Sequence, residues 1–144
     1  MGGEILVIQL LPCDRNVALW GGIMTAGAHA KGLKGAILDS GVRDVTEIRR
    51  DYDFPVFARS ISPGTTLGRY KTYASNVPVV CGGITVNPGD LICADNDGVV
   101  VIPATYVEEV LSFAEDIEKR EALQAKLICE EKSIKKGLEK YNRI

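Results

Sequence analysis

The stretch that decides the fold is Trp20–Asp44, which reads WGGIMTAGAHAKGLKGAILDSGVRD. Its first part is rich in alanine and other small residues and stops at Gly32, which predicts a helix that begins near the Gly21-Gly22 pair. Its second part contains a short apolar run, Gly35–Leu38, which predicts a strand. A helix followed at once by a strand is the repeating unit of an α/β fold.

The flanking residues continue this alternation. An apolar, β-branched run predicts a buried strand over Gly3–Leu10, and a short polar helix over Val42–Arg50 precedes a strand over Pro55–Ala58. From Pro78 onward the pattern changes to closely spaced strands separated by turn sequences, which is typical of antiparallel hairpins. These strands are predicted over Pro78–Val80, Ile84–Val86, Leu91–Ala94 and Val99–Ile102.

The remaining residues predict one long C-terminal helix over 105–141. Thr105 and Glu108 have the spacing of a capping box, and apolar residues then recur at helical intervals. Charges of both signs dominate the later part, which favours a solvated or subunit-packing helix.

Composition limits the classes of protein that fit. The 144 residues are 46% hydrophobic, which predicts a single domain over 1–144, and a net charge of -2 argues against a nucleic-acid partner. No apolar run approaches the roughly 20 residues of a membrane helix, and no secretory signal is visible, so we expect a cytoplasmic protein with no membrane partner. His29 is the only histidine and the four cysteines form no CxxC pair, so any metal would be held by oxygen.

The densest group of candidate functional residues is Asp39–Asp44, which follows a predicted strand. Arg43 could pair with a carboxylate and Asp44 could ligate a hard cation, although a structural ion pair at a helix start is the commoner explanation of such residues. The glycines of Gly21–Met24 offer backbone amides for an anion, or they serve only to turn the chain.

Three segments together resemble a known family. They are WGGIMTAGAHAKGLKGAILDSGVRD, FPVFARSISP and PVVCGGITVNPGDLICADNDGVVVIP, within 14–103. In this order and spacing they resemble the regulator of ribonuclease activity A (RraA-like) and 4-hydroxy-4-methyl-2-oxoglutarate/4-carboxy-4-hydroxy-2-oxoadipate (HMG/CHA) aldolase superfamily. The resemblance implies an α/β fold of the swivelling ββα type, assembled as a homotrimer or hexamer with sites between subunits.

The resemblance also implies a chemistry. Aldolases of this superfamily use Mg²⁺ or Mn²⁺ to cleave 2-oxo acids to pyruvate, and many decarboxylate oxaloacetate. By position, Arg43 would bind the substrate carboxylate and Asp44 the metal, both as catalytic residues. Backbone amides of Gly21, Gly22, Ile23 and Met24 would bind the pyruvoyl end.

Two departures from the superfamily pattern keep alternatives open. Aldolase members carry an aspartate at the position of Gly22, so the chain could instead be a non-catalytic regulator that binds a ribonuclease or helicase, or could act on another substrate. Glu47, one helical turn from Asp44, is a candidate replacement, although a solvated helix residue is the commoner role. Family members also have a helix and strands before the segment matching Gly3–Leu10, and we expect this domain to lack them.

Overall fold

The computed structural model describes residues 3–12 and 14–141, which form two compact units that divide after Val101. The prediction of a single domain over 1–144 stays a prediction. The predicted α/β class is confirmed in the first unit, and the second unit is helical.

The first unit is built on a parallel sheet with β3 (Gly35–Val42) at its centre. β4 (Val56–Ile61) pairs with one edge of β3, while β1 (Ile5–Ile8) and β2 (Ala18–Trp20) pair with successive parts of it. Every residue of β3 is buried. The predicted strand at Gly35–Leu38 therefore continues for a further four residues, and β2 lies where the sequence showed no strand signal.

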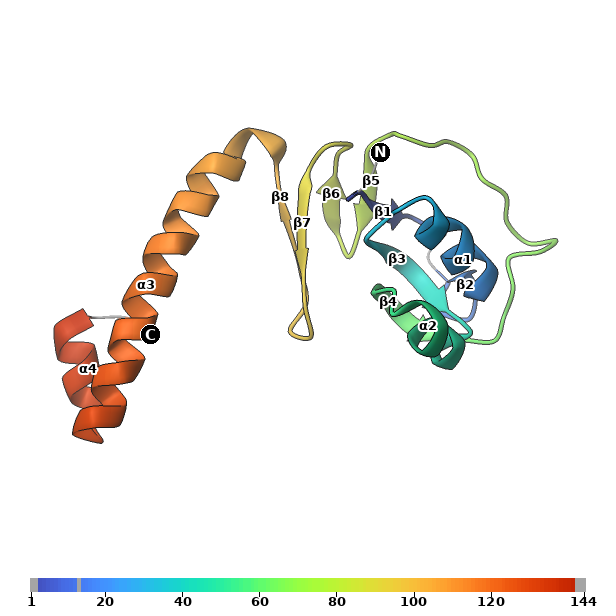
Figure 1. Ribbon diagram of the computed structural model, residues 1–144. Helices are drawn as coiled ribbons and strands as arrows, with labels where there is room; N and C mark the ends of the chain where they lie inside the picture. Colours follow the sequence, from blue (N-terminus) through green and yellow to red (C-terminus); the bar gives the residue numbers. More distant parts are fainter. Residues whose placement is uncertain (1–2, 13, 142–144) are drawn as a thin grey trace. The chain divides into compact units, whose positions relative to one another are not determined.

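Two helices connect these strands. α1 (Gly22–Ala30) leads into β3 and α2 (Val45–Tyr52) leads into β4, and the two helices lie side by side (Figure 1). The core joins Ala28 and Ile48 from the helices to alternate residues of β3 and to a ring stack of Trp20 on Phe54, with centroids 6.0 Å apart. The predicted helix start at the Gly21-Gly22 pair is confirmed, since Gly21 is the N-cap of α1.

Both predicted antiparallel hairpins are present. β5 (Val79–Cys81) pairs with β6 (Ile84–Val86) across Gly82 and Gly83, both of which have positive φ, as a tight two-residue hairpin turn requires. β7 (Leu91–Ala94) and β8 (Val99–Ile102) form the second hairpin.

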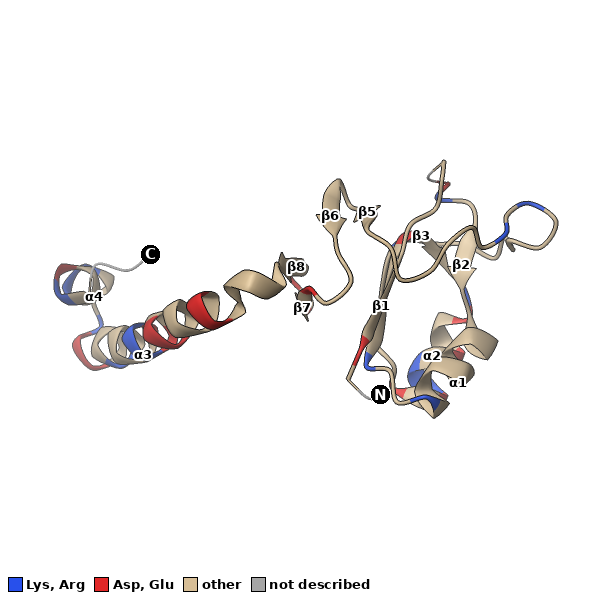
Figure 2. Cartoon of the chain, turned by 90° about the horizontal axis from the view of Figure 1, so that it is seen from above, with Lys and Arg blue, Asp and Glu red and all other residues tan. Residues whose placement is uncertain are grey.

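The C-terminal unit contains a 3-10 turn (Ala104–Tyr106), α3 (Val107–Glu131) and α4 (Ile134–Tyr141), with acidic and basic residues distributed along both helices (Figure 2). The predicted long helix is confirmed in α3, but it does not continue to residue 141. α3 ends at Glu131, because its C-cap Lys132 has a φ of 49° that breaks the helical path before α4. The predicted capping box is wrong, because Thr105 lies in the 3-10 turn and the N-cap Tyr106 makes no side-chain capping bond. No helix among the described residues is long and apolar enough to span a membrane.

Candidate active site at the ends of two parallel strands

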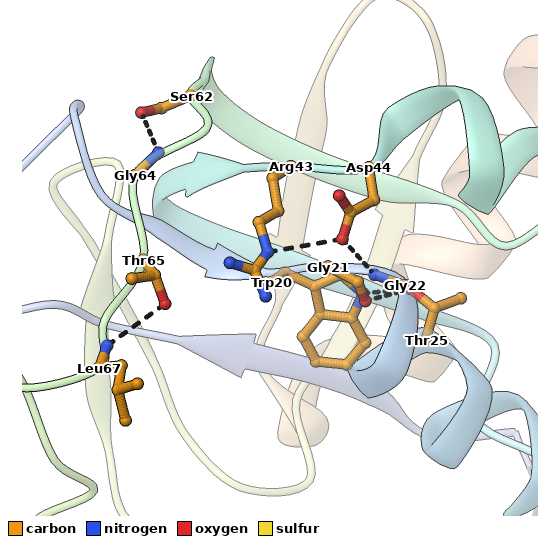
Figure 3. A network of polar contacts seen from close by, with 10 residues as sticks. All are labelled: Trp20, Gly21, Gly22, Thr25, Arg43, Asp44, Ser62, Gly64, Thr65 and Leu67. Carbon is orange, nitrogen blue, oxygen red and sulfur yellow. Dashed lines mark hydrogen bonds and ion pairs between the residues drawn. The ribbon is translucent and has the colours of Figure 1, made fainter.

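The site lies where β2 and β3 end side by side. Trp20 and Val42 are paired in the parallel register, and Arg43 N–H continues the ladder by donating to Trp20 O at 3.0 Å. Gly21 follows β2 and Asp44 follows Arg43, so the two predicted segments meet at the carboxyl ends of adjacent strands, where α/β sheets bind ligands. Figure 3 shows this meeting point.

Asp44 is the N-cap residue of α2, but its carboxylate does not cap that helix. With φ of 58° and ψ of 29°, its backbone is left-handed, and Oδ2 instead accepts a hydrogen bond from Gly22 N–H at 3.0 Å. The carboxylate therefore lies at the N-terminal end of α1, where the helix dipole favours negative charge. A simple helix-start role for Asp44 on its own helix is not what the structure shows.

Arg43 and Asp44 form an open ion pair. Arg43 Nε lies 3.4 Å from Asp44 Oδ2, and the two side chains are 42% and 39% exposed. Both contacts of the carboxylate use Oδ2. Within the described part of the chain, Asp44 Oδ1 and the terminal amino groups of Arg43 make no hydrogen bond or ion pair, which leaves them available to a ligand.

Gly21 permits this arrangement by having no side chain. A Cβ built on Gly21 would lie 2.7 Å from Asp44 Oδ2 and 2.9 Å from Arg43 Nε. Real Cβ atoms do not approach other heavy atoms so closely, so any larger residue would displace both functional groups.

The first-turn amides of α1 differ in their availability. Gly22 N–H, predicted as a substrate donor, already donates to Asp44. The amides of Ile23 and Met24 belong to the same turn, in which N–H groups have no carbonyl of the helix to bind. The Ile23 side chain is 87% exposed, so it adds an apolar surface beside these amides.

Glu47 occupies the space beside Gly22. A Cβ built on Gly22 would collide with the Glu47 carboxylate, which approaches from the first turn of α2. A carboxylate therefore lies close to Gly22, the position where the resemblance described above implies an aspartate in aldolase members. Helical spacing alone suggested a solvated role for Glu47, and the residue is indeed exposed. The packing of α1 beside α2 also brings its carboxylate to Gly22.

The donor set fits a hard divalent cation. Asp44 would supply one carboxylate for the cation, and the Glu47 carboxylate, which also borders Gly22, would remain for proton transfer. Mg²⁺ is usually held by one or two carboxylates, with water and substrate oxygens completing its shell. No group of three or more His, Cys, Asp or Glu side chains suitable for a metal occurs among residues 3–12 and 14–141, so a closed protein cage is not formed there.

The other polar residues of the predicted cluster have structural partners. Asp39 lies inside β3, and its Oδ1 accepts hydrogen bonds from Arg59 Nε at 2.6 Å and Gly82 N–H at 2.9 Å. Ser40 Oγ is buried and lies 2.6 Å from the carbonyl oxygens of Asp14 and Val17. The six-residue cluster thus divides into a buried part and the exposed Arg43-Asp44 pair.

The site is an open surface. One cavity of the first unit, about 360 Å³, lies over the other part of the sheet and is lined by Val7, Phe57 and Ile92, among others. A second cavity of about 240 Å³ is lined by residues of α2 and β4. Neither of these includes Arg43 or Asp44.

The chain belongs to the Aldolase/RraA family, because the RraA-like family model matches residues 1–101. A protein of Halalkalibacterium halodurans named "Putative 4-hydroxy-4-methyl-2-oxoglutarate aldolase" is 37% identical over 127 residues, covering 83% of this chain and 57% of that protein. The uncharacterized protein MJ0644 of Methanocaldococcus jannaschii is 39% identical over 110 residues, covering 74% of this chain and 50% of its own length. The chain therefore spans about half the length of these curated relatives.

Solved structures confirm the fold. An uncharacterized protein of Pseudomonas syringae superposes with a TM-score of 0.87 at 30% identity, covering 94% of this chain and 67% of that one. RraAS2 of Streptomyces coelicolor, described as an unusual member of the RNase ES inhibitor RraA protein family, superposes with a TM-score of 0.80 at 29% identity, covering 88% and 64%. The chain thus shares sequence with relatives named as putative aldolases and architecture with a member of an inhibitor family.

Proposed function

We propose that this chain carries the site of a divalent-metal-dependent carbon-carbon lyase that cleaves a 2-oxo acid to pyruvate, of the 4-hydroxy-4-methyl-2-oxoglutarate aldolase and oxaloacetate decarboxylase type. The observation that carries the proposal is the open Arg43-Asp44 pair, with Oδ1 and the guanidinium amino groups unengaged among the described residues, next to Glu47. The names of the aldolase relatives support the same chemistry.

Asp44 would hold Mg²⁺ or Mn²⁺ at its open oxygen. When bound, the cation supplies positive charge beside the 2-oxo acid, where negative charge develops as the bond breaks. Arg43 would bind the substrate carboxylate with its two terminal amino groups, since a guanidinium fork matches the geometry of a carboxylate.

Glu47 is the proposed acid-base group. In the aldol cleavage, its carboxylate would take the proton of the substrate hydroxyl, the carbon-carbon bond would break to give the second carbonyl product, and the electron pair would remain on the pyruvate enolate. The enolate then takes up a proton to release pyruvate. A positioned carboxylate suits this transfer, and no lysine Schiff base is required.

The open surface of the site supports a further part of the proposal. Substrate sites usually bury most of a small ligand, whereas Arg43 and Asp44 are both about 40% exposed in the isolated chain. We propose that a second copy covers the site in a homotrimer or hexamer, and that the protein works in the cytoplasm.

The test is an assay of pyruvate formation, in which lactate dehydrogenase detects the pyruvate. The substrates are 4-hydroxy-4-methyl-2-oxoglutarate and oxaloacetate. We expect turnover with Mn²⁺ or Mg²⁺ that stops on addition of a chelator and in Asp44→Ala. Absence of turnover on both substrates by the folded wild-type chain would contradict the proposal.

One observation favours a second candidate function. The resemblance implies an aspartate in aldolase members at the position that Gly22 has here, and RraAS2 is described within an RNase inhibitor family. The alternative is a non-catalytic regulator that binds a ribonuclease or an RNA helicase. It predicts capture of such a partner by the immobilised chain without metal-dependent turnover, and the reverse result would exclude it.

A further inference from the structure

Two buried residues behind the site are joined by a directed chain of hydrogen bonds. Trp20 Nε1 donates to Thr25 Oγ1 at 2.7 Å, and Thr25 Oγ1 lies 3.0 Å from Gly21 O (Figure 3). Trp20 is 2% exposed and Thr25 is fully buried. Neither side chain can reach solvent, so these bonds are not exchanged for bonds to bulk water.

The chemistry of the donors fixes the direction of this chain. An indole N–H can only donate, so the Thr25 hydroxyl accepts from Trp20 and its own proton is directed to Gly21 O. Thr25 N–H donates to the same carbonyl oxygen at 3.0 Å. One residue therefore holds the Gly21 carbonyl with two hydrogen bonds.

The Gly21 carbonyl belongs to the peptide unit whose other end is Gly22 N–H. Because the peptide is planar and trans, fixing the carbonyl fixes the direction of the N–H. That N–H donates to Asp44 Oδ2 at 3.0 Å. Two consecutive glycines would otherwise allow this peptide to rotate with little steric resistance.

We propose that Thr25 and Trp20 are positioning residues, which orient the Asp44 carboxylate through the Gly21–Gly22 peptide and leave Oδ1 turned toward the ligand. The proposal rests on the proposed function, in which Asp44 holds the metal. Trp20 is itself fixed by its stack on Phe54 and by the core around Ala28. These hydrogen bonds thus connect the core of the sheet to the exposed carboxylate of Asp44.

Supporting hydrogen bonds of this kind usually change metal affinity by 10–100-fold when they are removed. Thr25→Val keeps the shape of the side chain and removes the hydroxyl, whereas Thr25→Ser keeps the hydroxyl. Trp20→Phe removes the indole donor and keeps an aromatic ring. These variants separate hydrogen bonding from packing, and a thermal unfolding curve confirms that each is folded.

The first measurement needs no metal. The rate of hydrogen exchange at the Gly22 amide, measured by NMR, reports the hydrogen bond of this amide to Asp44. The Asp44→Ala variant gives the reference rate in the absence of that bond. We expect exchange at least about tenfold faster in Thr25→Val than in wild type, with Thr25→Ser close to wild type and Trp20→Phe in between.

The second measurement is Mn²⁺ affinity, followed by electron paramagnetic resonance of the free ion. We expect Thr25→Val to weaken binding about tenfold or more and Thr25→Ser to restore it. Wild-type Gly22 exchange together with wild-type affinity in folded Thr25→Val would overturn the inference, as would an equal loss in Thr25→Ser. If the wild-type protein itself binds no Mn²⁺, the proposed function fails. The exchange rates still decide whether the hydrogen bonds of Trp20 and Thr25 orient Asp44.

Discussion

Asp44 and Gly22 are 22 residues apart, yet the carboxylate of one accepts the backbone N–H of the other at 3.0 Å. The bond exists because β2 and β3 run parallel and end together, which places the start of α1 beside the start of α2. It turns the Asp44 carboxylate away from its own helix and toward the end of β2. The predictions for Gly21 and Glu47 below depend on this placement of the two helix starts.

Gly21→Ala should disable the site without unfolding the protein. The added methyl group would lie 2.7 Å from Asp44 Oδ2 and 2.9 Å from Arg43 Nε, so both groups must move. We expect Mn²⁺ affinity to fall by about tenfold or more. Gly27→Ala is the matched control, because a Cβ there meets nothing within 4 Å, and it should retain affinity while stabilising α1 by up to about 1 kcal/mol.

Glu47→Gln should slow pyruvate formation by about 10²–10⁴-fold, which is the usual contribution of a positioned acid-base group. Gly22→Asp placed in a Glu47→Ala background should recover part of the lost rate, because removal of the Glu47 carboxylate frees the space beside residue 22. Asp51→Asn, on the exposed surface of the same helix, should retain the wild-type rate. A Glu47→Gln variant with unchanged turnover would show that this carboxylate has no catalytic role.

Gly137→Leu should loosen the C-terminal helical unit. A Cβ at Gly137 would collide with the Ile128 side chain, and the next nearest atom is Gln124 Cγ, so α4 packs closely on α3 at this point. Overpacking of this kind costs about 1–3 kcal/mol of unfolding free energy, which denaturant unfolding can measure. Lys135→Leu adds the same side chain at an exposed position of α4 and should leave the stability almost unchanged. Equal effects of the two substitutions would contradict the packing argument.

The same helical unit should show a small acid-dependent stability. Hydrogen bonding to Lys136 lowers the pKa of Glu131 below its usual value of 4.5. Since the pKa is lower in the folded state, the stabilisation is present above pH 4.5 and is lost as the pH falls through the lowered value. Thermal melts of wild type and Lys136→Met should differ near neutral pH and converge in acid. A difference that persists at the acid end would show that the effect is not electrostatic.

Local signals in the sequence were sufficient for much of the fold. The strands Ile84–Val86, Leu91–Ala94 and Val99–Ile102 were predicted with the bounds that the structure has, because Gly-Gly and Asn-Asp-Gly turns fix hairpins over a few residues. β3 was predicted too short because Asp39 and Ser40 look like surface residues. Their burial depends on bonds to Arg59 and Val17, which are distant in the sequence.

The residues of the candidate site could be selected from the sequence, but their geometry could not. Arg43, Asp44 and the Gly21–Met24 turn were selected from the sequence, and the parallel pairing of β2 with β3 brings them together. Glu47 lies beside Gly22 only because α1 packs beside α2. The buried hydrogen bonds from Trp20 through Thr25 likewise form only when α1 packs against the sheet. The spacing of residues along one helix predicts neither the proximity of Glu47 to Gly22 nor these hydrogen bonds.

The most direct test of the central claim is a crystal structure of the chain with Mn²⁺ and oxalate, a stable mimic of the pyruvate enolate. We predict an anomalous peak for Mn²⁺ at Oδ1 of Asp44, with oxalate chelating the ion and one of its carboxylates on the Arg43 guanidinium. Crystals in which the ion binds elsewhere, or in which Arg43 points away from a bound oxalate, would contradict the account.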